Sequence, residues 1–171
     1  MVGKSGSEWK KGVLLLLNLY PKTLMQQFLG EFECRLDDKG RLRLPSDLLR
    51  QMSGAEKMGF MVNRGFENCL VMYPKTEWDK LSAEINQLNM YVKENRDFVR
   101  YFFRGASELN LDASERVNFP KTLLDYISAT KEVVLFAYFN RIEIWSKEMY
   151  ENMLNEEPGD FAKLAEKVMG Q

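Results

Sequence analysis

Apolar and polar positions follow two different periods along this chain, and each period predicts a different kind of element. Leu42 and Leu44 alternate with Arg41 and Arg43, which is the period of two expected of a half-buried strand. In 75–88, large apolar residues recur every three or four positions, which predicts an amphipathic helix. By the same criteria, the other predicted strands are 28–36, 59–63, 69–73, a strand ending at 111, 116–119, 133–138 and 141–145. The other predicted helices are 46–52, 93–103, 121–127, 147–154 and 160–168.

Turn residues and a proline separate the first strands from the helix that follows them. Residues 37–40 are Asp-Asp-Lys-Gly, and the glycine supplies the positive φ that a tight turn needs. Pro45 ends the next strand and suits the start of a helix, so we expect Ser46 or Asp47 near the helix cap. A strand, a tight turn, a short strand and a short helix are therefore predicted in succession.

This order of elements occurs twice, because the sequence itself is repeated. Residues 36–49 return as 111–124 at an offset of 75, and both copies keep Leu, Asp, Arg, Pro and a Leu-Leu pair at matching positions. Further on, 68–75 match 140–147 at an offset of 72, so the first copy carries about three extra residues, a difference that loops tolerate. Two copies are too few for a solenoid. We infer a pseudo-two-fold pair in which each half covers the other's apolar face.

The repeat divides the chain into five segments. We expect repeat halves at 28–76 and 104–147, joined by helices in 77–103 and followed by C-terminal helices in 148–171. Residues 1–24 lie outside the repeat and are interpreted as an appendage: a tag remnant, an over-long start or a flexible, disordered arm. Their two adjacent lysines and apolar run imitate a signal peptide, but the run is too short to span a bilayer and no cleavage site follows. We therefore expect no membrane partner.

Composition narrows the chemistry that the chain can perform. A net charge of −1 over 171 residues argues against coating nucleic acid or membrane through bulk charge, so any anion-binding surface must be local. Histidine is absent, which removes the commonest general base and the commonest neutral metal ligand. Phosphate-binding glycine loops, paired-cysteine motifs and serine-nucleophile motifs are also absent. We expect no enzyme activity, cofactor or metal, and we interpret Cys34 and Cys69 as buried thiols of a cytoplasmic protein.

An aspartate stands four residues before an arginine in each copy, across the predicted tight turn. The pairs are Asp37 with Arg41 and Asp112 with Arg116. At this spacing the carboxylate can bond the guanidinium or the backbone amides of the turn. For the two aspartates we favour this role as a staple of the turn.

The arginine of the first copy is the stronger candidate for binding another molecule. Arg41 shares a strand face with Arg43 and follows Lys39 and Gly40 directly. A guanidinium is a planar fork that suits phosphate oxygens and the O6/N7 edge of guanine. A two-stranded ribbon with such a face fits the major groove of B-DNA. We therefore expect these four residues to contact DNA.

The second copy departs from this pattern. Ser114 and Glu115 stand where the first copy has its lysine and glycine, and Asn118 replaces the second arginine of the strand. An acid thus occupies the position at which a glycine lets the backbone approach a phosphate. We expect Arg116 to be the weaker DNA contact, and the second turn to be chiefly the structural counterpart of the first.

Together these segments resemble the MraZ family of bacterial transcriptional regulators. The resemblance is carried by Phe-Leu-Gly-Glu-Phe at 28–32, Leu-Asp-Asp-Lys-Gly-Arg-Leu at 36–42, Leu-Pro at 44–45 and the paired Asp-x-x-x-Arg motifs that mark the family. It covers about residues 25–169 and implies an α+β fold. In that fold, two SpoVT/AbrB-like swapped-hairpin halves pack as an internal pseudo-dimer, with helices between the halves and at the C-terminus. The motif residues carried over by position are Asp37, Lys39, Gly40, Arg41, Asp112 and Arg116.

The resemblance also implies a function and partners. Subunits would assemble into a closed ring and bind double-stranded DNA at short direct repeats in the promoter of the division and cell-wall gene cluster. There the protein would act as a repressor or regulator, in the cytoplasm and associated with the nucleoid. Several modest basic loops on one duplex would act together through effective concentration.

Two other hypotheses are open at this point. In the first, the Asp–Arg turns only staple the fold, and the helices between the halves bind a protein partner, so that the chain is an interaction scaffold. Exposed apolar residues on these helices would mark a subunit interface, although the aromatic run 101–103 is expected in the core. In the second, a hydrolase uses Asp37, Asp38 or Asp112, which is disfavoured because no partners for acid–base chemistry surround these carboxylates.

Overall fold

The two copies of the repeat form matching sets of strands and helices in the computed structural model, which describes residues 27–155 and 159–170. The expected appendage of residues 1–24 lies outside the described residues. The first half contains β1 (Phe28–Arg35), β2 (Arg41–Arg43), α2 (Ser46–Gln51), the 3-10 helix η1 (Ala55–Met58), β3 (Phe60–Arg64) and β4 (Leu70–Pro74). The second half contains β5 (Ser107–Leu109), β6 (Arg116–Asn118), α5 (Lys121–Tyr126), β7 (Glu132–Phe139) and β8 (Arg141–Ser146). Helices α3 (Lys75–Ile85) and α4 (Lys93–Phe103) join the halves, and α6 (Lys147–Asn155) and α7 (Phe161–Met169) follow the second.

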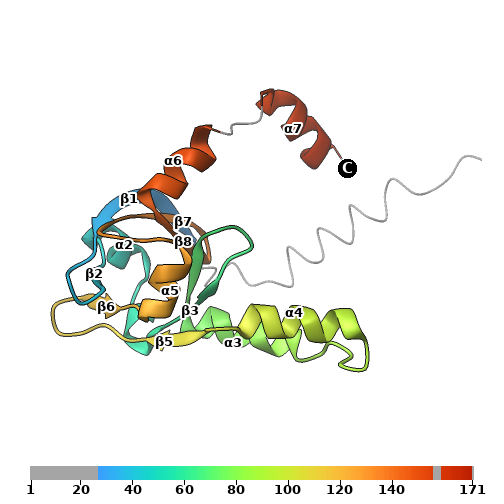
Figure 1. Cartoon of the computed structure of the whole chain (residues 1–171), viewed down its shortest axis with the longest axis horizontal. Helices are drawn as coiled ribbons and strands as arrows, with labels where there is room; N and C mark the ends of the chain where they lie inside the picture. The colour runs from blue at the N-terminus through green and yellow to red at the C-terminus, as the bar shows by residue number, and fades with distance from the viewer. Residues whose placement is uncertain (1–26, 156–158, 171) are drawn as a thin grey trace, which may run out of the picture.

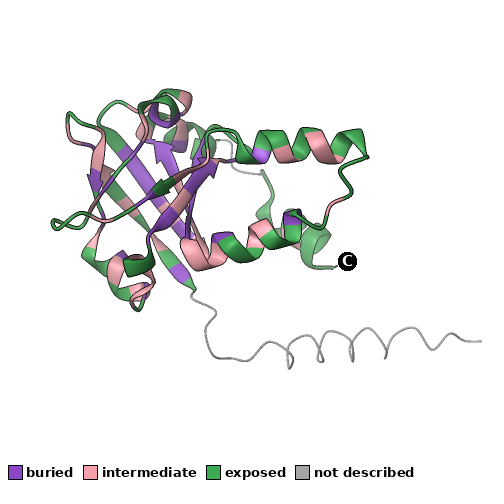
Figure 2. Ribbon diagram, turned by 90° about the horizontal axis from the view of Figure 1, so that it is seen from below, coloured by how far each residue is buried: buried purple, intermediate pink, exposed green. Residues whose placement is uncertain are grey.

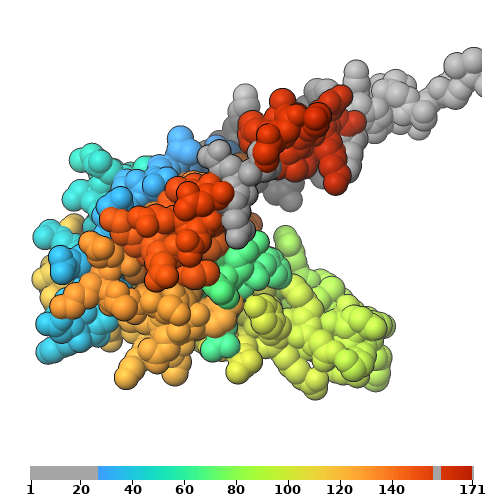
Figure 3. Space-filling view, turned by 45° about the horizontal axis from the view of Figure 1, so that its top comes forward, coloured from blue at the N-terminus to red at the C-terminus, as the bar shows by residue number. Residues whose placement is uncertain are grey.

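The halves exchange their first strands. The main sheet has the order β1-β7-β8-β4-β3-β5, so β1 of the first half pairs with β7 of the second, and β5 of the second pairs with β3 of the first. Strands β2 and β6 pair in a separate two-stranded ribbon. When each strand is replaced by its counterpart in the other half, the order read from one edge of the sheet becomes the order read from the other edge. This is the pseudo-two-fold arrangement expected from the repeat. The α+β fold of two swapped-hairpin halves is thus confirmed, and Figure 3 shows their surfaces, blue and orange, interleaved.

Matching residues of the two halves build one core between the main sheet and the ribbon. Leu42 and Val117, paired across the ribbon, are both fully buried, as are Leu48 of α2 and Leu123 of α5. Arg43, next to Leu42, is exposed, so the predicted alternation is confirmed. Burial of each such aliphatic side chain contributes ~1.5–3 kcal/mol. The ribbon is therefore fixed to the body from beneath, while Arg43 and Asn118 are exposed on its outer face.

A second apolar cluster lies on the opposite face of the main sheet and fixes the bases of α3 and α4. Trp78 of α3 stacks on Phe102 of α4, with ring centroids 5.4 Å apart. Both helices project from the same end of the body (Figures 1 and 2), and α4 is the more exposed of the two along its length. The expectation that the run 101–103 lies in the core is right for Phe102 only. Tyr101 and Phe103 are 42% and 37% exposed, because α4 packs on the body through one side near its end.

Helices α2 and α5 begin in the same way, at a proline. Pro45 and Pro120 occupy the cap positions, and neither helix has a side-chain hydrogen bond at its cap. Ser46 and Asp47 lie next to the cap, as expected: they are the first two helical residues, Pro45 holds the cap position itself, and Asp47 pairs with a side chain of its own helix.

The two cysteines are free thiols in different settings. Cys69 is buried, as expected, whereas the expectation for Cys34 is wrong: it is only half-buried, because β1 is an edge strand of the main sheet. Burial raises the pKa of the Cys69 thiol to about 12 and that of the Cys34 thiol to about 11. Among the residues that the structure describes, none of the helices combines the length and the apolar character needed to cross a bilayer.

Candidate nucleic-acid interface

The β2–β6 ribbon brings the two Asp–Arg motifs onto one surface, with one strand from each half. In the antiparallel register, Arg41 lies opposite Asn118 and Arg43 lies opposite Arg116. Each turn directly precedes its strand, so the two turns lie at opposite ends of the ribbon. Figure 1 shows the ribbon on the side of the body away from the far ends of α3 and α4. The pairing of β2 with β6 therefore makes one composite surface from two distant parts of the sequence.

Asp37 closes the first turn and orients its arginine. Its Oδ1 accepts hydrogen bonds from the backbone N–H groups of Lys39 at 2.9 Å and Arg41 at 3.0 Å. Its Oδ2 accepts from Arg41 Nε at 2.7 Å and lies 2.6 Å from Arg41 Nη2. The backbone hydrogen bond from Arg41 is the leading reason why the pKa of Asp37 lies below its ordinary value. One carboxylate thus holds both the turn backbone and the guanidinium.

Asp112 forms the same contacts in the second turn. Its Oδ1 accepts from the backbone N–H groups of Ser114 at 2.8 Å and Arg116 at 3.0 Å, and its Oδ2 accepts from Arg116 Nε at 2.8 Å. The side-chain hydrogen bond from Arg116 is the leading cause that lowers the pKa of Asp112 to about 2. The same bond raises the pKa of Arg116. Both carboxylates therefore stay charged over the physiological range.

Both arginines present part of their guanidinium group to solvent. Their side chains are 31% exposed at Arg41 and 32% exposed at Arg116. A guanidinium has five N–H donors, and its aspartate uses one on Nε and one on Nη2, which leaves three for a ligand. Because the planar group is already oriented, it needs little further ordering to meet a phosphate or a guanine edge. The ribbon is thus equipped with two prepositioned anion-binding forks.

The side chains around these two forks differ. In the first turn Lys39 is exposed and Gly40 adopts a φ of +74°, which glycine tolerates best. In the second turn Glu115 occupies the equivalent place with a φ of +59°. Its Oε2 lies 3.4 Å from Nη2 of Arg43, whose side chain is 71% exposed. A carboxylate of the second half therefore faces a cation of the first.

The structure gathers the residues singled out in the sequence on the ribbon and its turns. They are Lys39, Gly40, Arg41, Arg43 and Arg116, with Asp37 and Asp112 behind the two arginines. Their role in DNA binding stays a prediction. Sequence reasoning missed the contact between Arg43 and Glu115, and the ion pair of Lys131 with Asp38 at 3.3 Å. Both contacts join the two halves.

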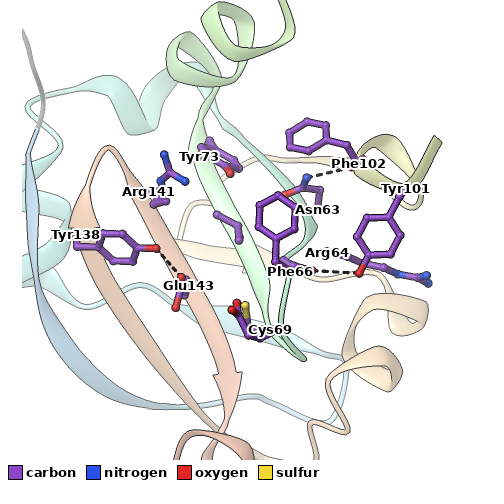
Figure 4. A pocket seen from close by; sticks show the side chains of 13 residues that line it. Asn63, Arg64, Phe66, Cys69, Tyr73, Tyr101, Phe102, Tyr138, Arg141 and Glu143 are labelled. Atoms are coloured by element: carbon purple, nitrogen blue, oxygen red, sulfur yellow. Dashed lines mark hydrogen bonds between the residues drawn. The ribbon is translucent and has the colours of Figure 1, made fainter. Parts of the chain in front are cut away.

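A cavity of about 260 Å³ lies elsewhere, beside the connection of β3 to β4 (Figure 4). Buried Asn63 donates from Nδ2 to the carbonyl of Phe102 at 3.1 Å, and the Tyr138 hydroxyl donates to Glu143 at 2.6 Å. Several of its polar side chains are thus engaged with neighbouring groups. Across the described ranges, no group of three Asp, Glu, Cys or His side chains is placed to hold a metal ion. The ribbon is the stronger candidate site.

Comparison with known proteins decides the family. The protein-family model described as "MraZ protein, putative antitoxin-like" matches the chain twice in succession, over residues 27–101 and 102–170. The chain belongs to the MraZ family. Each match contains one Asp–Arg turn, so the internal repeat is the family unit in duplicate.

Curated relatives of the MraZ family match most of the chain. A protein of Flavobacterium psychrophilum is 44% identical over 147 residues, which span 85% of this chain and 94% of that relative. A relative from Christiangramia forsetii is 42% identical over 85% of this chain and 95% of its own length. A relative from Cytophaga hutchinsonii is 37% identical over 83% of this chain and 94% of its own length. All three are named transcriptional regulator MraZ. The resemblance found in the sequence is confirmed, and the chain belongs to a family of transcription regulators.

Proposed function

We propose that this chain is a sequence-specific DNA-binding transcription regulator that acts as a repressor of the division and cell-wall gene cluster. The observation that carries the proposal is the pair of aspartate-oriented, partly exposed arginines on the β2–β6 ribbon. Arg41 reads or anchors the DNA, while Lys39 and Arg43 contact phosphates and Gly40 lets the backbone approach. Arg116 adds a weaker contact, and the protein acts at the nucleoid.

The ribbon suits double-stranded DNA in shape and in chemistry. A two-stranded β-ribbon fits the width of the major groove, and an arginine there can bond the O6 and N7 atoms of guanine at once. Each neutralised phosphate adds a counterion-release contribution, with a salt slope of about −0.9 per contact. A chain with a net charge of −1 can therefore bind DNA through a local basic surface.

We further propose that copies of the chain assemble into a closed ring and bind direct repeats in the promoter. One ribbon offers few contacts, but several ribbons on one duplex raise the total affinity through effective concentration. Subunits related by successive rotations suit direct repeats better than an isolated two-fold dimer would. Exposed large apolar residues on α4 and α7 support self-association. They are Phe98, Tyr101 and Phe103 on α4, and Phe161, Leu164, Val168 and Met169 on α7.

The proposal is tested by titrating labelled upstream DNA with the protein and with two arginine variants. Arg41→Ala should lower the affinity by ~5-fold or more at about 0.15 M salt, since a bidentate contact with guanine is worth ~1–3 kcal/mol. Arg100→Ala removes the same charge from exposed α4 and serves as the matched control, with affinity near that of the parent. If Arg41→Ala binds as tightly as the parent, the site assignment is wrong.

An interaction scaffold is the second candidate function. It is favoured by the same exposed aromatic residues on α4 and by the tight closure of both Asp–Arg turns, which would then be purely structural. Binding to promoter DNA that is weak and insensitive to salt, together with an unchanged affinity of Arg41→Ala, would support the scaffold over the regulator.

A further inference from the structure

The backbones of the two turns match hydrogen bond for hydrogen bond, so their side chains can be compared place by place. The N–H of Gly40 donates to the Asp37 carbonyl at 3.0 Å, and the N–H of Glu115 donates to the Asp112 carbonyl at 3.0 Å. The Gly40 carbonyl accepts from the other half at 3.1 Å, and the Glu115 carbonyl accepts from the other half at 3.0 Å. Glu115 therefore occupies the pseudo-symmetric place of Gly40.

A glutamate is not the residue that this backbone favours. Glu115 has a φ of +59°, in the left-handed region where glycine is at ease and other residues are strained. The fold itself would accept a glycine there, as it does at Gly40. The side chain that is present instead lies beside Arg43 across the ribbon, 3.4 Å from carboxylate to guanidinium.

The charges at the two ends of the ribbon are consequently unequal. The first turn, 37–41, holds two acids and two bases, whereas the second, 112–116, holds two acids and one base. A DNA phosphate approaching the second turn meets the exposed Glu115 carboxylate. Moreover, this carboxylate competes with the phosphate for Arg43.

Building on the proposed function, we propose that Glu115 sets the DNA affinity of the ribbon by holding Arg43 and by keeping phosphates away from the second turn. Its effect is to leave the first turn as the dominant contact of each subunit. The distance of 3.4 Å is longer than a strong charge-assisted hydrogen bond of ~2.7–2.9 Å, so Arg43 can be released when DNA arrives. Glu115 is thus an affinity-determining residue and not itself a contact.

The experiment compares DNA titrations of the parent with Glu115→Gln and Glu115→Gly across a range of salt concentrations. Glu115→Gln keeps the size of the side chain and removes its charge, and Glu115→Gly copies the first turn. Both should bind upstream DNA several-fold to about tenfold more tightly, with a salt slope steeper by about 0.9 for one added phosphate contact. Glu84→Gln on α3 makes the same charge change away from the ribbon and should leave the affinity unchanged.

A double variant tests whether Glu115 acts through Arg43. In the Arg43→Ala background, Glu115→Gln should give a clearly smaller gain, because the cation that it would release is gone. An equal gain in both backgrounds would overturn this step of the inference. Thermal unfolding of each variant, compared with the parent, shows that the binding differences do not come from loss of folded protein.

Two results would overturn the inference outright while leaving the proposed function intact. If Arg41→Ala loses DNA binding but Glu115→Gln binds like the parent, Glu115 does not set the affinity. If Glu115→Gln binds more weakly than the parent, the carboxylate itself accepts a hydrogen bond, for example from a cytosine amino group. If the parent binds no DNA at all, the proposed function falls and this inference falls with it.

Discussion

The two Asp–Arg turns share one hydrogen-bonding framework and differ in the chemistry around it. Corresponding distances from aspartate to backbone and guanidinium differ by at most 0.2 Å between the turns. The residues between aspartate and arginine differ at every position, and only the first turn combines a lysine with a glycine. The aspartate therefore closes the turn and orients its arginine in the same way in both halves, and the chemical contrast between the turns lies in the three residues between them.

The largest effect is expected from the core that supports both turns. Leu42→Ala should lower the free energy of unfolding by ~2–5 kcal/mol, because the fully buried side chain leaves a cavity between ribbon and sheet. Val117→Ala, its partner across the ribbon, removes fewer atoms and should cost less. Urea denaturation followed by circular dichroism measures both. Leu29→Ala, at a side chain that is 77% exposed, is the control and should change stability by less than ~0.5 kcal/mol.

The next largest effect is a difference between the two halves in their contribution to DNA affinity. Arg41→Ala should cost ~1–3 kcal/mol of binding free energy, and Arg116→Ala less than ~1 kcal/mol, since the second turn lacks the lysine and carries a glutamate. Fluorescence anisotropy on the same upstream DNA compares the two variants. Equal losses would mean that the halves contribute alike and that the contrast between the turns does not extend to function.

Substitutions at the matching positions Gly40 and Glu115 test the backbone part of the comparison. Gly40→Ala should destabilise the protein by ~1–2 kcal/mol, because φ is +74° and the new Cβ would meet Leu124 Cδ1 at 3.1 Å. Glu115→Gly relieves the left-handed glutamate and should be neutral or stabilising by up to ~1 kcal/mol. Differential scanning calorimetry measures both. Loss of stability in Glu115→Gly would show that the Arg43 contact outweighs the backbone strain.

The smallest effect is a pH dependence at the second turn. The pKa of Asp112 falls from an ordinary 3.8 to about 2 on folding, so its charge stabilises the folded protein above about pH 4, and this contribution is lost as the pH falls through about 2. Asp112→Asn should therefore be less stable than the parent at pH 5, with a difference that narrows toward pH 2. Urea midpoints at several pH values measure it. A difference that does not change with pH would show that Asp112 acts through shape and not through charge.

Local patterns predicted the elements well wherever the pattern and the packing agree. The helix predicted at 93–103 has those bounds in α4, and the alternation around Leu42 predicted the buried face of β2. The repeat predicted a pseudo-two-fold pair, and the family resemblance supplied the exchange of strands. No sequence pattern predicted η1, which follows Gly54 at a φ of +95°.

The parts that escaped prediction depend on how distant segments meet. The contact of Arg43 with Glu115 joins residues 72 positions apart, and it exists only because β2 pairs with β6. The exposure of Phe103 depends on the angle at which α4 leaves the sheet, which its own periodicity does not encode. A repeat can thus be recognised from sequence, whereas contacts between its copies require the register.

The exchange of first strands has a consequence during synthesis. Phe28 of β1 pairs with Phe139 of β7, a separation of 111 residues. At ~5–20 residues per second, the opening strand leaves the ribosome roughly 5–20 s before its partner has been made. A nascent chain must therefore carry β1 with its backbone N–H and C=O groups unpaired for that interval, and such an edge can pair with another chain. Translation speed across the second copy thus sets how long that edge stays open.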